Sequence, residues 1–272
     1  MRLFLILSVM AVAALLWWHF STPKTLSDQE FAEVYSDPLP KQRPKSVYHL
    51  GHSLVGRDMP AMLSQLMGSN YNSQLGWGAS LRNHWQEDVP GFAEENRTMA
   101  FRPARAALAS AEYDALIVTE MVELKDAIRY HDSAAALADW ARHARSARPG
   151  IRIYLYETWH KLDDPAGWEA RIRQDLPNLW ERQVLRPAMA GKDVGLIHVI
   201  PAGQVMAAVV ARIEAGDMPG LSTRADLFGK GADGAPDMIH LADIGRDVVA
   251  LTRFAGLAGE NPMGLPHGLR RA

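Results

Sequence analysis

The chain has 272 residues, of which 48% are hydrophobic and 22% charged, and its formal net charge is −2. This composition excludes a disordered chain, and Lys, Arg, Asp and Glu are mixed without a basic stripe, so nucleic acid is not an expected partner. The absence of cysteine excludes disulfide bridges, thiol nucleophiles, Cys-ligated zinc and lipoprotein acylation.

Residues 1–21 form an apolar N-terminal segment. One positive charge, Arg2, precedes an apolar run that reaches Phe20, a pattern typical of a signal peptide or signal anchor. The run is close to the minimum that spans a bilayer, and Trp17 and Trp18 lie at its outer end, where aromatic side chains favour the interface. No small-x-small cleavage site follows it. We therefore expect an exported protein, anchored in the inner membrane and facing the periplasm, or periplasmic or secreted if the segment is cleaved.

The rest of the chain divides into a spacer, one domain and a tail. Residues 22–45 are polar and rich in proline, which predicts an extended spacer. The domain is expected at 46–260, and the tail at 261–272. Apolar runs predict strands at 47–50, 71–75, 115–119, 151–156 and 194–200. Helical spacing predicts helices at 60–67, 102–112, 133–147, 177–190, 202–215 and 241–257, and the Gly- and Asp-rich stretch at 216–236 predicts a loop.

Five strands separated by helical segments predict an α/β fold, a three-layer α/β/α sandwich with a five-stranded parallel sheet. In such open sheets, ligands bind outside the carboxyl ends of the strands. Residues that carry chemistry are therefore expected just after a strand.

Ser53 follows the first predicted strand, in the sequence Gly51-His52-Ser53-Leu54. A nucleophilic serine needs a tight turn that raises its hydroxyl above the sheet edge, and glycine permits such a turn. The pattern alone has low specificity, because many turns between a strand and a helix contain Gly and Ser.

Asp237 and His240 supply the groups that such a serine needs. They lie in Asp237-Met238-Ile239-His240, just before the last predicted helix. A serine hydroxyl requires a base, and the base requires an acid that fixes its tautomer. The alternative is that Asp237 caps the helix and His240 packs in its first turn.

Together these segments resemble the SGNH/GDSL hydrolase superfamily. Gly51-His52-Ser53-Leu54 is similar to its first motif, with His in place of the usual Asp, and Asp237-x-x-His240 is similar to its last. Gly76-Trp77-Gly78-Ala79-Ser80-Leu81 resembles the block whose glycine N–H helps to form the oxyanion hole. The resemblance implies a flavodoxin-like α/β fold, catalytic residues Ser53, Asp237 and His240, and oxyanion donors at Ser53 and Gly78, with Gly76 as the alternative.

The third block of the family is atypical here. The family has Gly-x-Asn-Asp after its third strand, whereas this chain reads Val118-Thr119-Glu120-Met121. Loss of one oxyanion donor costs about 10²–10³ in rate unless another group replaces it. Asn83 is the candidate replacement, since it is close in sequence to Gly78, and a solvated loop asparagine is the alternative.

Polar and aromatic residues at the ends of strands three and four are candidate substrate-binding residues: Glu120, Glu157, Trp159 and His160. For Glu120, orientation of Asn83 or Arg82 and a role as a capping carboxylate are alternatives. The insertion at 161–180, which contains Trp168 and Trp180, is expected to cover the site, although core packing is an equal alternative for these aromatic residues. His160 is a weaker candidate base, because no Asp is placed beside it as Asp237 is beside His240.

The sequence therefore predicts a serine esterase that needs no cofactor or metal. The substrate is expected to be a small-molecule or glycan ester, with acetyl groups of an envelope or extracellular glycan favoured. A lysophospholipase or thioesterase acting on longer acyl chains is the alternative within the enzyme class. A non-catalytic glycan-binding or assembly protein on the same scaffold is the alternative outside it, and acyl transfer would use the same residues.

Overall fold

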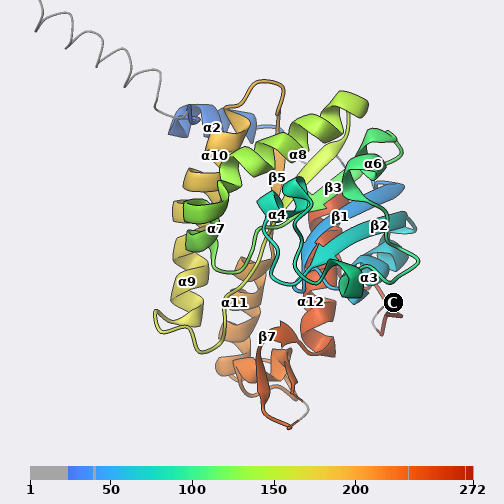
Figure 1. Cartoon of the computed structure of the whole chain (residues 1–272). Helices are drawn as coiled ribbons and strands as arrows, with labels where there is room; N and C mark the ends of the chain where they lie inside the picture. Colours follow the sequence, from blue (N-terminus) through green and yellow to red (C-terminus); the bar gives the residue numbers. More distant parts are fainter. Residues whose placement is uncertain (1–23, 39–40, 232, 267, 272) are drawn as a thin grey trace, which may run out of the picture.

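The computed structural model describes residues 24–38, 41–231, 233–266 and 268–271, so the predicted signal or anchor segment lies outside the described residues. Among those described, no helix is both long and apolar enough to cross a bilayer. A parallel sheet with strand order β2-β1-β3-β4-β5 forms the centre of the molecule (Figure 1). Its strands are β1 (Ser46–His52), β2 (Asn70–Gly76), β3 (Ala115–Val118), β4 (Arg152–Glu157) and β5 (Ile197–Pro201). The five predicted strands and the flavodoxin-like order are confirmed.

Helices cover both faces of the sheet because successive strand residues point to opposite sides. On β3, Ala115 and Ile117 belong to one apolar core, and Leu116 and Val118 belong to the other. The first core also contains residues of α3 (Asp58–Met67), α11 (Ala202–Glu214) and α12 (Asp243–Ala258). The second contains residues of α4 (Leu81–Gln86), α6 (Ala104–Ala109), α7 (Leu124–His131), α8 (Ser133–Ala147) and α10 (Arg186–Met189).

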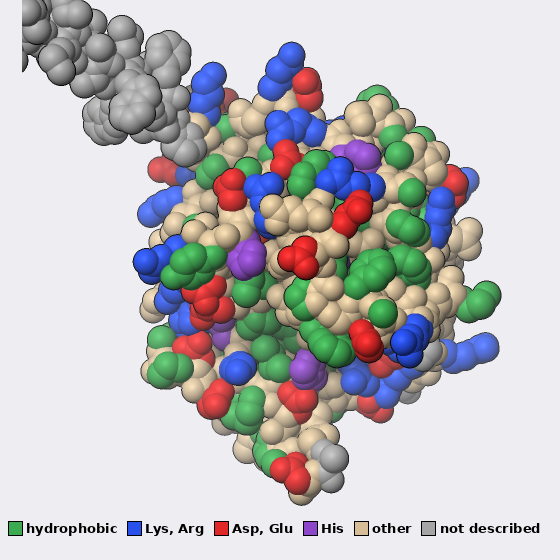
Figure 2. Space-filling view, in the orientation of Figure 1, with side chains coloured by type: hydrophobic (Ala, Val, Ile, Leu, Met, Phe, Trp, Pro, Cys, Tyr) green, Lys and Arg blue, Asp and Glu red, His purple; other side chains and the backbone are tan. Residues whose placement is uncertain are grey.

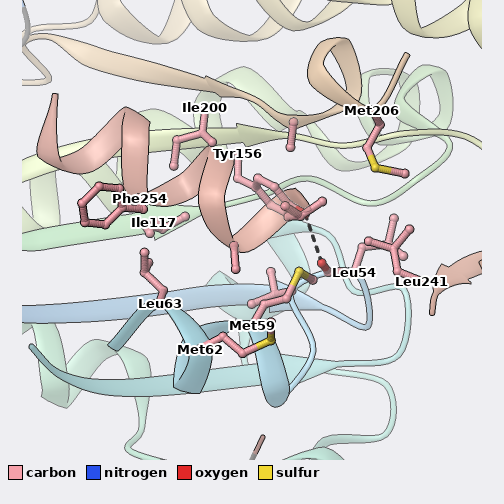
Figure 3. Packing of buried hydrophobic residues seen from close by; sticks show 14 of the residues in the cluster. Leu54, Met59, Met62, Leu63, Ile117, Tyr156, Ile200, Met206, Leu241 and Phe254 are labelled. Atoms are coloured by element: carbon pink, nitrogen blue, oxygen red, sulfur yellow. Dashed lines mark hydrogen bonds between the residues drawn. The ribbon is translucent and has the colours of Figure 1, made fainter. Parts of the chain in front are cut away.

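The first core supports the chain just after Ser53. Figure 3 shows Tyr156 of β4 beside Leu54, with Met59 and Leu63 of α3 in the same apolar layer. The Tyr156 hydroxyl donates a hydrogen bond to the Leu54 carbonyl at 3.3 Å. The backbone that carries the candidate nucleophile is therefore tied to the centre of the sheet.

The segment expected to cover the site is part of the core. Helix α9 (Trp168–Asp175) continues through the π-helical turns at Leu176–Leu185 into α10. Trp168 and Trp180 are only 1% and 3% exposed. Core packing, the alternative interpretation of these two residues, is the correct one.

The predicted spacer differs from the structure, because it contains helix α2 (Asp28–Val34). Ser27 and Glu30 form a capping box at its start, a Ser-x-x-Glu pattern that the prediction of an extended segment overlooked. Phe31 and Tyr35 pack against the second core, and the Tyr35 hydroxyl donates to the Ile197 carbonyl of β5. The folded unit therefore begins before residue 46.

The predicted loop at 216–236 contains further structure. Strand β6 (Phe228–Lys230) pairs in antiparallel fashion with β7 (Pro236–Leu241), just before α12. This hairpin lies at the lower end of the molecule in Figure 1, beyond the carboxyl ends of the central strands. Asp237 and His240 therefore lie on a strand, and not in the first turn of a helix.

Candidate active site

Ser53 lies in a tight turn directly after β1. The His52 carbonyl accepts the Val55 N–H at 2.8 Å, which turns the chain and leaves Ser53 half-buried at the carboxyl edge of the sheet. A Cβ atom at Gly51 would lie 2.7 Å from side-chain carbons of both Thr119 and Val55. Only glycine allows this close approach, so the glycine before the nucleophile turn has a steric cause.

Ser53, His240 and Asp237 form a continuous chain of hydrogen bonds. His240 Nε2 lies 3.0 Å from Ser53 Oγ, and His240 Nδ1 lies 2.9 Å from Asp237 Oδ2. The other Asp237 oxygen accepts the backbone N–H groups of Ile239 and His240 at 2.9 and 2.8 Å. The carboxylate thus accepts a hydrogen bond from Nδ1–H, which keeps the proton on Nδ1 and leaves Nε2 unprotonated and able to accept the serine proton.

The environment of Asp237 keeps its carboxylate ionised. Partial burial raises the pKa of Asp237, but the hydrogen bonds from the backbone N–H groups of His240 and Ile239 and from the His240 ring lower it more. The pKa of Asp237 therefore lies below the ordinary value of an aspartate. A charged acceptor beside His240 is the partner that an imidazolium needs.

Ser53 and His240 open into a cavity of about 470 Å³. Leu54 and Met59 contribute apolar surface to it. Four charged side chains that the sequence analysis did not select also line it: Arg57, Asp58, Glu95 and Arg246. They come from α3, α5 (Phe92–Glu95), α12 and the turn after β1. Only Arg57 and Asp58 could have been found from the sequence, because they follow the nucleophile turn directly.

The backbone N–H groups of Ser53 and Gly78, the expected oxyanion donors, lie in two neighbouring turns. Gly76 is paired with His52 in the sheet, so the turn that contains Gly78 lies beside the turn that contains Ser53. Gly78 is exposed and has a φ of +54°. Within the part of the chain that the structure describes, neither N–H donates to a protein acceptor.

Asn83 has a different position from the one expected. Its side-chain oxygen accepts the Ser80 N–H at 3.0 Å and the Ser80 hydroxyl at 2.7 Å, which caps helix α4. Asn83 is not among the residues that line the cavity. Its conformation is explained by the helix cap, and the geometry gives no support to a role as oxyanion donor.

His52 replaces the usual Asp of the first motif and acts as a neutral bridge. It is fully buried, and burial lowers the pKa of His52 to about 4, so the ring is uncharged at neutral pH. Nε2 lies 2.8 Å from the Glu120 carbonyl, and Nδ1 accepts the Leu54 N–H at 3.3 Å. The ring therefore connects the Ser53 turn to the end of β3.

Glu120 and Glu157 are not positioned to bind substrate, because both are fully buried. Glu120 accepts the backbone N–H groups of Leu81 and Met121 at 3.2 and 2.8 Å, and Glu157 accepts the backbone and side-chain N–H groups of Gln204. Burial raises the pKa of Glu120 to about 7 and that of Glu157 to about 8. The prediction that they contact substrate is corrected: these carboxyl groups accept from N–H donors in the interior, and the contact of Glu120 with the first N–H of α4 agrees with the alternative of a capping carboxylate.

His160 is also buried, and its partner is an acid that sequence proximity did not reveal. Its Nε2 lies 3.1 Å from Asp175 of α9, which is also 2.9 Å from the guanidinium of Arg171. None of these three residues lines the cavity. His160 therefore anchors the loop after β4 and is not a second base.

Trp159 lines the cavity but is only 1% exposed. Its indole Nε1–H donates to the Ile239 carbonyl at 2.8 Å, and the Leu162 N–H donates to the Met238 carbonyl at the same distance. Both acceptors lie on β7, just before His240. The loop after β4 thus holds the strand that carries the candidate base, and this role replaces the expected sugar-binding face.

No group of three or more potential metal ligands occurs among the described residues. The sequence matches no protein-family model, and no curated protein is significantly similar to it.

Several solved structures resemble the chain. A GDSL-like lipase from Parabacteroides merdae has a TM-score of 0.48 and 12% identity, over 82% of this chain and 99% of that one. A salicylyl-acyltransferase from a tetracycline biosynthetic pathway has a TM-score of 0.48 and 15% identity. That match covers 85% of this chain and 58% of the acyltransferase chain. A family 3 carbohydrate esterase from Clostridium thermocellum has a TM-score of 0.39 and 12% identity. That match covers 78% of this chain and 94% of the esterase chain. By the strand order of its own sheet and the helices on both faces, the chain has the α/β/α fold expected from its resemblance to the SGNH/GDSL hydrolases.

Proposed function

We propose that the chain is a serine ester hydrolase of the SGNH/GDSL type that works through an acyl-enzyme. The observation that carries this proposal is the hydrogen-bonded chain from Asp237 through His240 to Ser53, at the carboxyl edge of the sheet and beside an open cavity. Nucleophile, base and orienting acid in this order are the requirements of covalent acyl transfer.

In the proposed reaction, the Ser53 hydroxyl gives its proton to His240 Nε2 as Oγ attacks the ester carbonyl carbon. Asp237 stabilises the imidazolium that forms. His240 then returns the proton to the leaving alkoxide as the ester C–O bond breaks, which leaves an acyl group on Ser53. Water attacks this acyl group while His240 Nε2 takes a proton from it. His240 then returns that proton to Ser53 Oγ as the bond between Oγ and the acyl carbon breaks, which releases the acid and restores free Ser53.

The negative charge on the carbonyl oxygen needs donors that are already in place. The unpaired N–H groups of Ser53 and Gly78 support their assignment as these donors. Preorganised donors stabilise the transition state without reorganisation during the reaction.

A polar ester with a short acyl group, such as an acetylated glycan, fits the cavity best. Its wall combines charged and apolar side chains: Arg57, Asp58, Glu95 and Arg246 with Leu54, Val55, Met59, Trp159 and Leu241. The charged groups suit a polar ester, whereas a long acyl chain would leave them without a partner. On the face seen in Figure 2, acidic, basic and apolar side chains are interspersed, which also suits a polar substrate. Hydrolysis of longer acyl esters and non-catalytic glycan binding are the alternatives.

The test is hydrolysis of 4-nitrophenyl acetate, butyrate and decanoate by the purified full-length chain and by Ser53→Ala. We expect turnover that decreases as the acyl chain lengthens, and its loss in Ser53→Ala with an unchanged circular dichroism spectrum. Equal activity in the variant would exclude Ser53 as nucleophile. A preference for decanoate would favour the lipid alternative, and no activity in either protein would favour the binding protein.

The proposed cellular location rests on residues 1–21 alone. We propose that this segment anchors the chain in the inner membrane and that the domain faces the periplasm. The choice of an envelope glycan depends on it. Membrane fractionation of cells that produce the chain with and without residues 1–21 tests this location, and equal recovery from the soluble fraction would contradict it.

A further inference from the structure

Trp77 is an exposed aromatic residue near the candidate active site. It follows Gly76, the last residue of β2, and precedes the proposed oxyanion donor Gly78. Trp77 is 55% exposed, whereas Trp159 and Trp168 are buried. Trp77 is not among the residues that line the cavity with Ser53, but its turn lies next to the Ser53 turn because Gly76 is paired with His52.

The indole ring is held in one orientation. Its Nε1–H donates to Glu95 Oε1 at 2.9 Å, and the Trp77 backbone N–H donates to the Pro90 carbonyl at 2.7 Å. A Cβ atom at Gly91 would lie 2.2 Å from ring atom Cδ2 and 2.5 Å from Cε2. Because these are the ring-fusion carbons, only a contact above the ring plane can reach them. Gly91 therefore packs on one face of the indole.

Glu95 connects this ring to the cavity. It accepts the Trp77 Nε1–H and also lines the cavity with Ser53 and His240. Arg57, which lines the same cavity, has its Nε 3.9 Å from Glu95 Oε2 and donates to the Glu94 carbonyl at 2.5 Å. A fixed aromatic face thus adjoins a carboxylate acceptor and a guanidinium donor.

This combination matches the chemistry of a sugar ring. A pyranose presents C–H groups on its face, which contact an aromatic ring, and hydroxyl groups at its edge, which hydrogen-bond to charged side chains. A long acyl chain has no groups that can hydrogen-bond to Glu95 and Arg57. The aromatic face is rigid, so little conformational entropy is lost when a ligand packs on it.

We propose that Trp77, with Glu95 and Arg57, forms a sugar subsite beside Ser53, in which a pyranose ring of the ester substrate packs on the exposed face of the indole. This inference rests on the proposed esterase function and specifies its substrate class as sugar esters. Trp77 contributes affinity for the sugar and takes no part in bond making or breaking.

The test compares sugar acetates with an ester that has no ring. The probes are glucose pentaacetate, acetylated xylo-oligosaccharides and ethyl acetate, and acid release is followed by pH-stat with full-length protein. The measured quantity is the ratio of kcat/KM for each sugar acetate to kcat/KM for ethyl acetate. We expect Trp77→Ala to lower this ratio about tenfold, mainly through KM, as expected for loss of one aromatic contact.

Two further variants control for folding and for exposed aromatic residues in general. Trp77→Phe retains a smaller aromatic face and loses the Nε1–H, so it should keep a ratio between those of the wild type and Trp77→Ala. Tyr130→Ala removes a 66% exposed aromatic residue on α7 and should leave the ratio unchanged. Circular dichroism checks that each variant is folded.

The possible failures are distinguishable. Wild-type protein that hydrolyses ethyl acetate but has the same ratio as Trp77→Ala, or that hydrolyses no sugar acetate, contradicts the sugar subsite alone. Wild-type protein that hydrolyses none of the probes contradicts the esterase function and the subsite together.

Discussion

The indole nitrogen of Trp159 lies 2.8 Å from the carbonyl oxygen of Ile239, one residue before His240. This bond joins the loop after β4 to the hairpin that carries the candidate base. Ser53 lies in the turn directly after β1 of the central sheet. The distance between Ser53 and His240 therefore depends on how rigidly the hairpin is positioned relative to that sheet. Trp159 is therefore a positioning residue for the base.

Trp159→Phe removes the Nε1–H and retains most of the aromatic packing. We expect kcat for 4-nitrophenyl acetate to fall about tenfold with little change in KM, because His240 would spend less time within hydrogen-bond distance of Ser53. Steady-state kinetics measures this split between kcat and KM.

Trp168→Phe is the matched control. Trp168 is equally buried, but its Nε1–H has no hydrogen-bond partner among the described residues, so its loss should leave kcat near the wild-type value. If the two variants lose the same activity, general loosening of the core explains the effect, and the positioning role of Trp159 is wrong.

His52 offers a second test, because its two ring nitrogens have different partners. Asn at this position can retain the acceptor for the Leu54 N–H, while Gln can retain the donor to the Glu120 carbonyl. The bond to Leu54 lies beside Ser53 and should matter more for the nucleophile. We expect His52→Asn to lower kcat by about threefold and His52→Gln by about thirtyfold.

Kinetics of both His52 variants on 4-nitrophenyl acetate, together with thermal unfolding, measure this difference. Similar kcat losses in the two variants, in proportion to their losses of stability, would indicate that His52 serves only the fold.

Glu157 predicts a pH dependence of stability. Burial raises the pKa of Glu157 in the folded chain to about 8, from 4.5 in the unfolded one. Between these values the folded chain holds a proton that the unfolded chain has released. The free energy of unfolding must therefore fall as pH rises through this window, by at most about 1.4 kcal/mol per pH unit.

The buried histidines have the opposite effect on the pH dependence of the free energy of unfolding. Burial lowers the pKa of His52 and His84 to about 4, so they add stability as pH rises from about 4 to 6.5. Above pH 7 these histidines no longer titrate. Glu120, whose pKa is about 7, still contributes to the lower part of this range with the same sign as Glu157, and it does so equally in the wild type and in a Glu157 variant. Urea unfolding at pH 7 to 8.5 should therefore show a flatter dependence for Glu157→Gln, which cannot ionise, than for the wild type. Glu87→Gln, at a side chain 75% exposed, should keep the wild-type slope; a wild-type slope in Glu157→Gln would mean that Glu157 is ionised when folded.

Local sequence signals were sufficient for the sheet and for the chemistry that follows it. Each central strand is a short apolar run between turn-forming residues, and such runs are visible in the sequence. Ser53 and the Asp237–His240 pair were found because their residue types and their positions after or before an element are also local. The structure brings these three side chains together.

Sequence position could not decide which side chains after a strand face the cavity. Glu157 and Trp159 lie at the same strand end, but the carboxylate is fixed by Gln204 and the indole by Ile239, each more than forty residues away. These hydrogen-bond partners depend on how segments far apart in the sequence pack together. Hydrophobic periodicity carries no information about that packing. The same limit explains why Glu95 and Arg246 were missed.

Helix α2 has a consequence for the outer edge of the sheet. Strand β5 is last in the strand order, and an unpaired strand edge can pair with the edge of another molecule. The Tyr35 hydroxyl donates to one β5 carbonyl, and Phe31, Val34 and Tyr35 line a cavity together with His198 and Val199 of that strand. The segment at 31–38 therefore shields part of the β5 edge, and a chain shortened to residue 46 would expose that edge to pairing with another molecule.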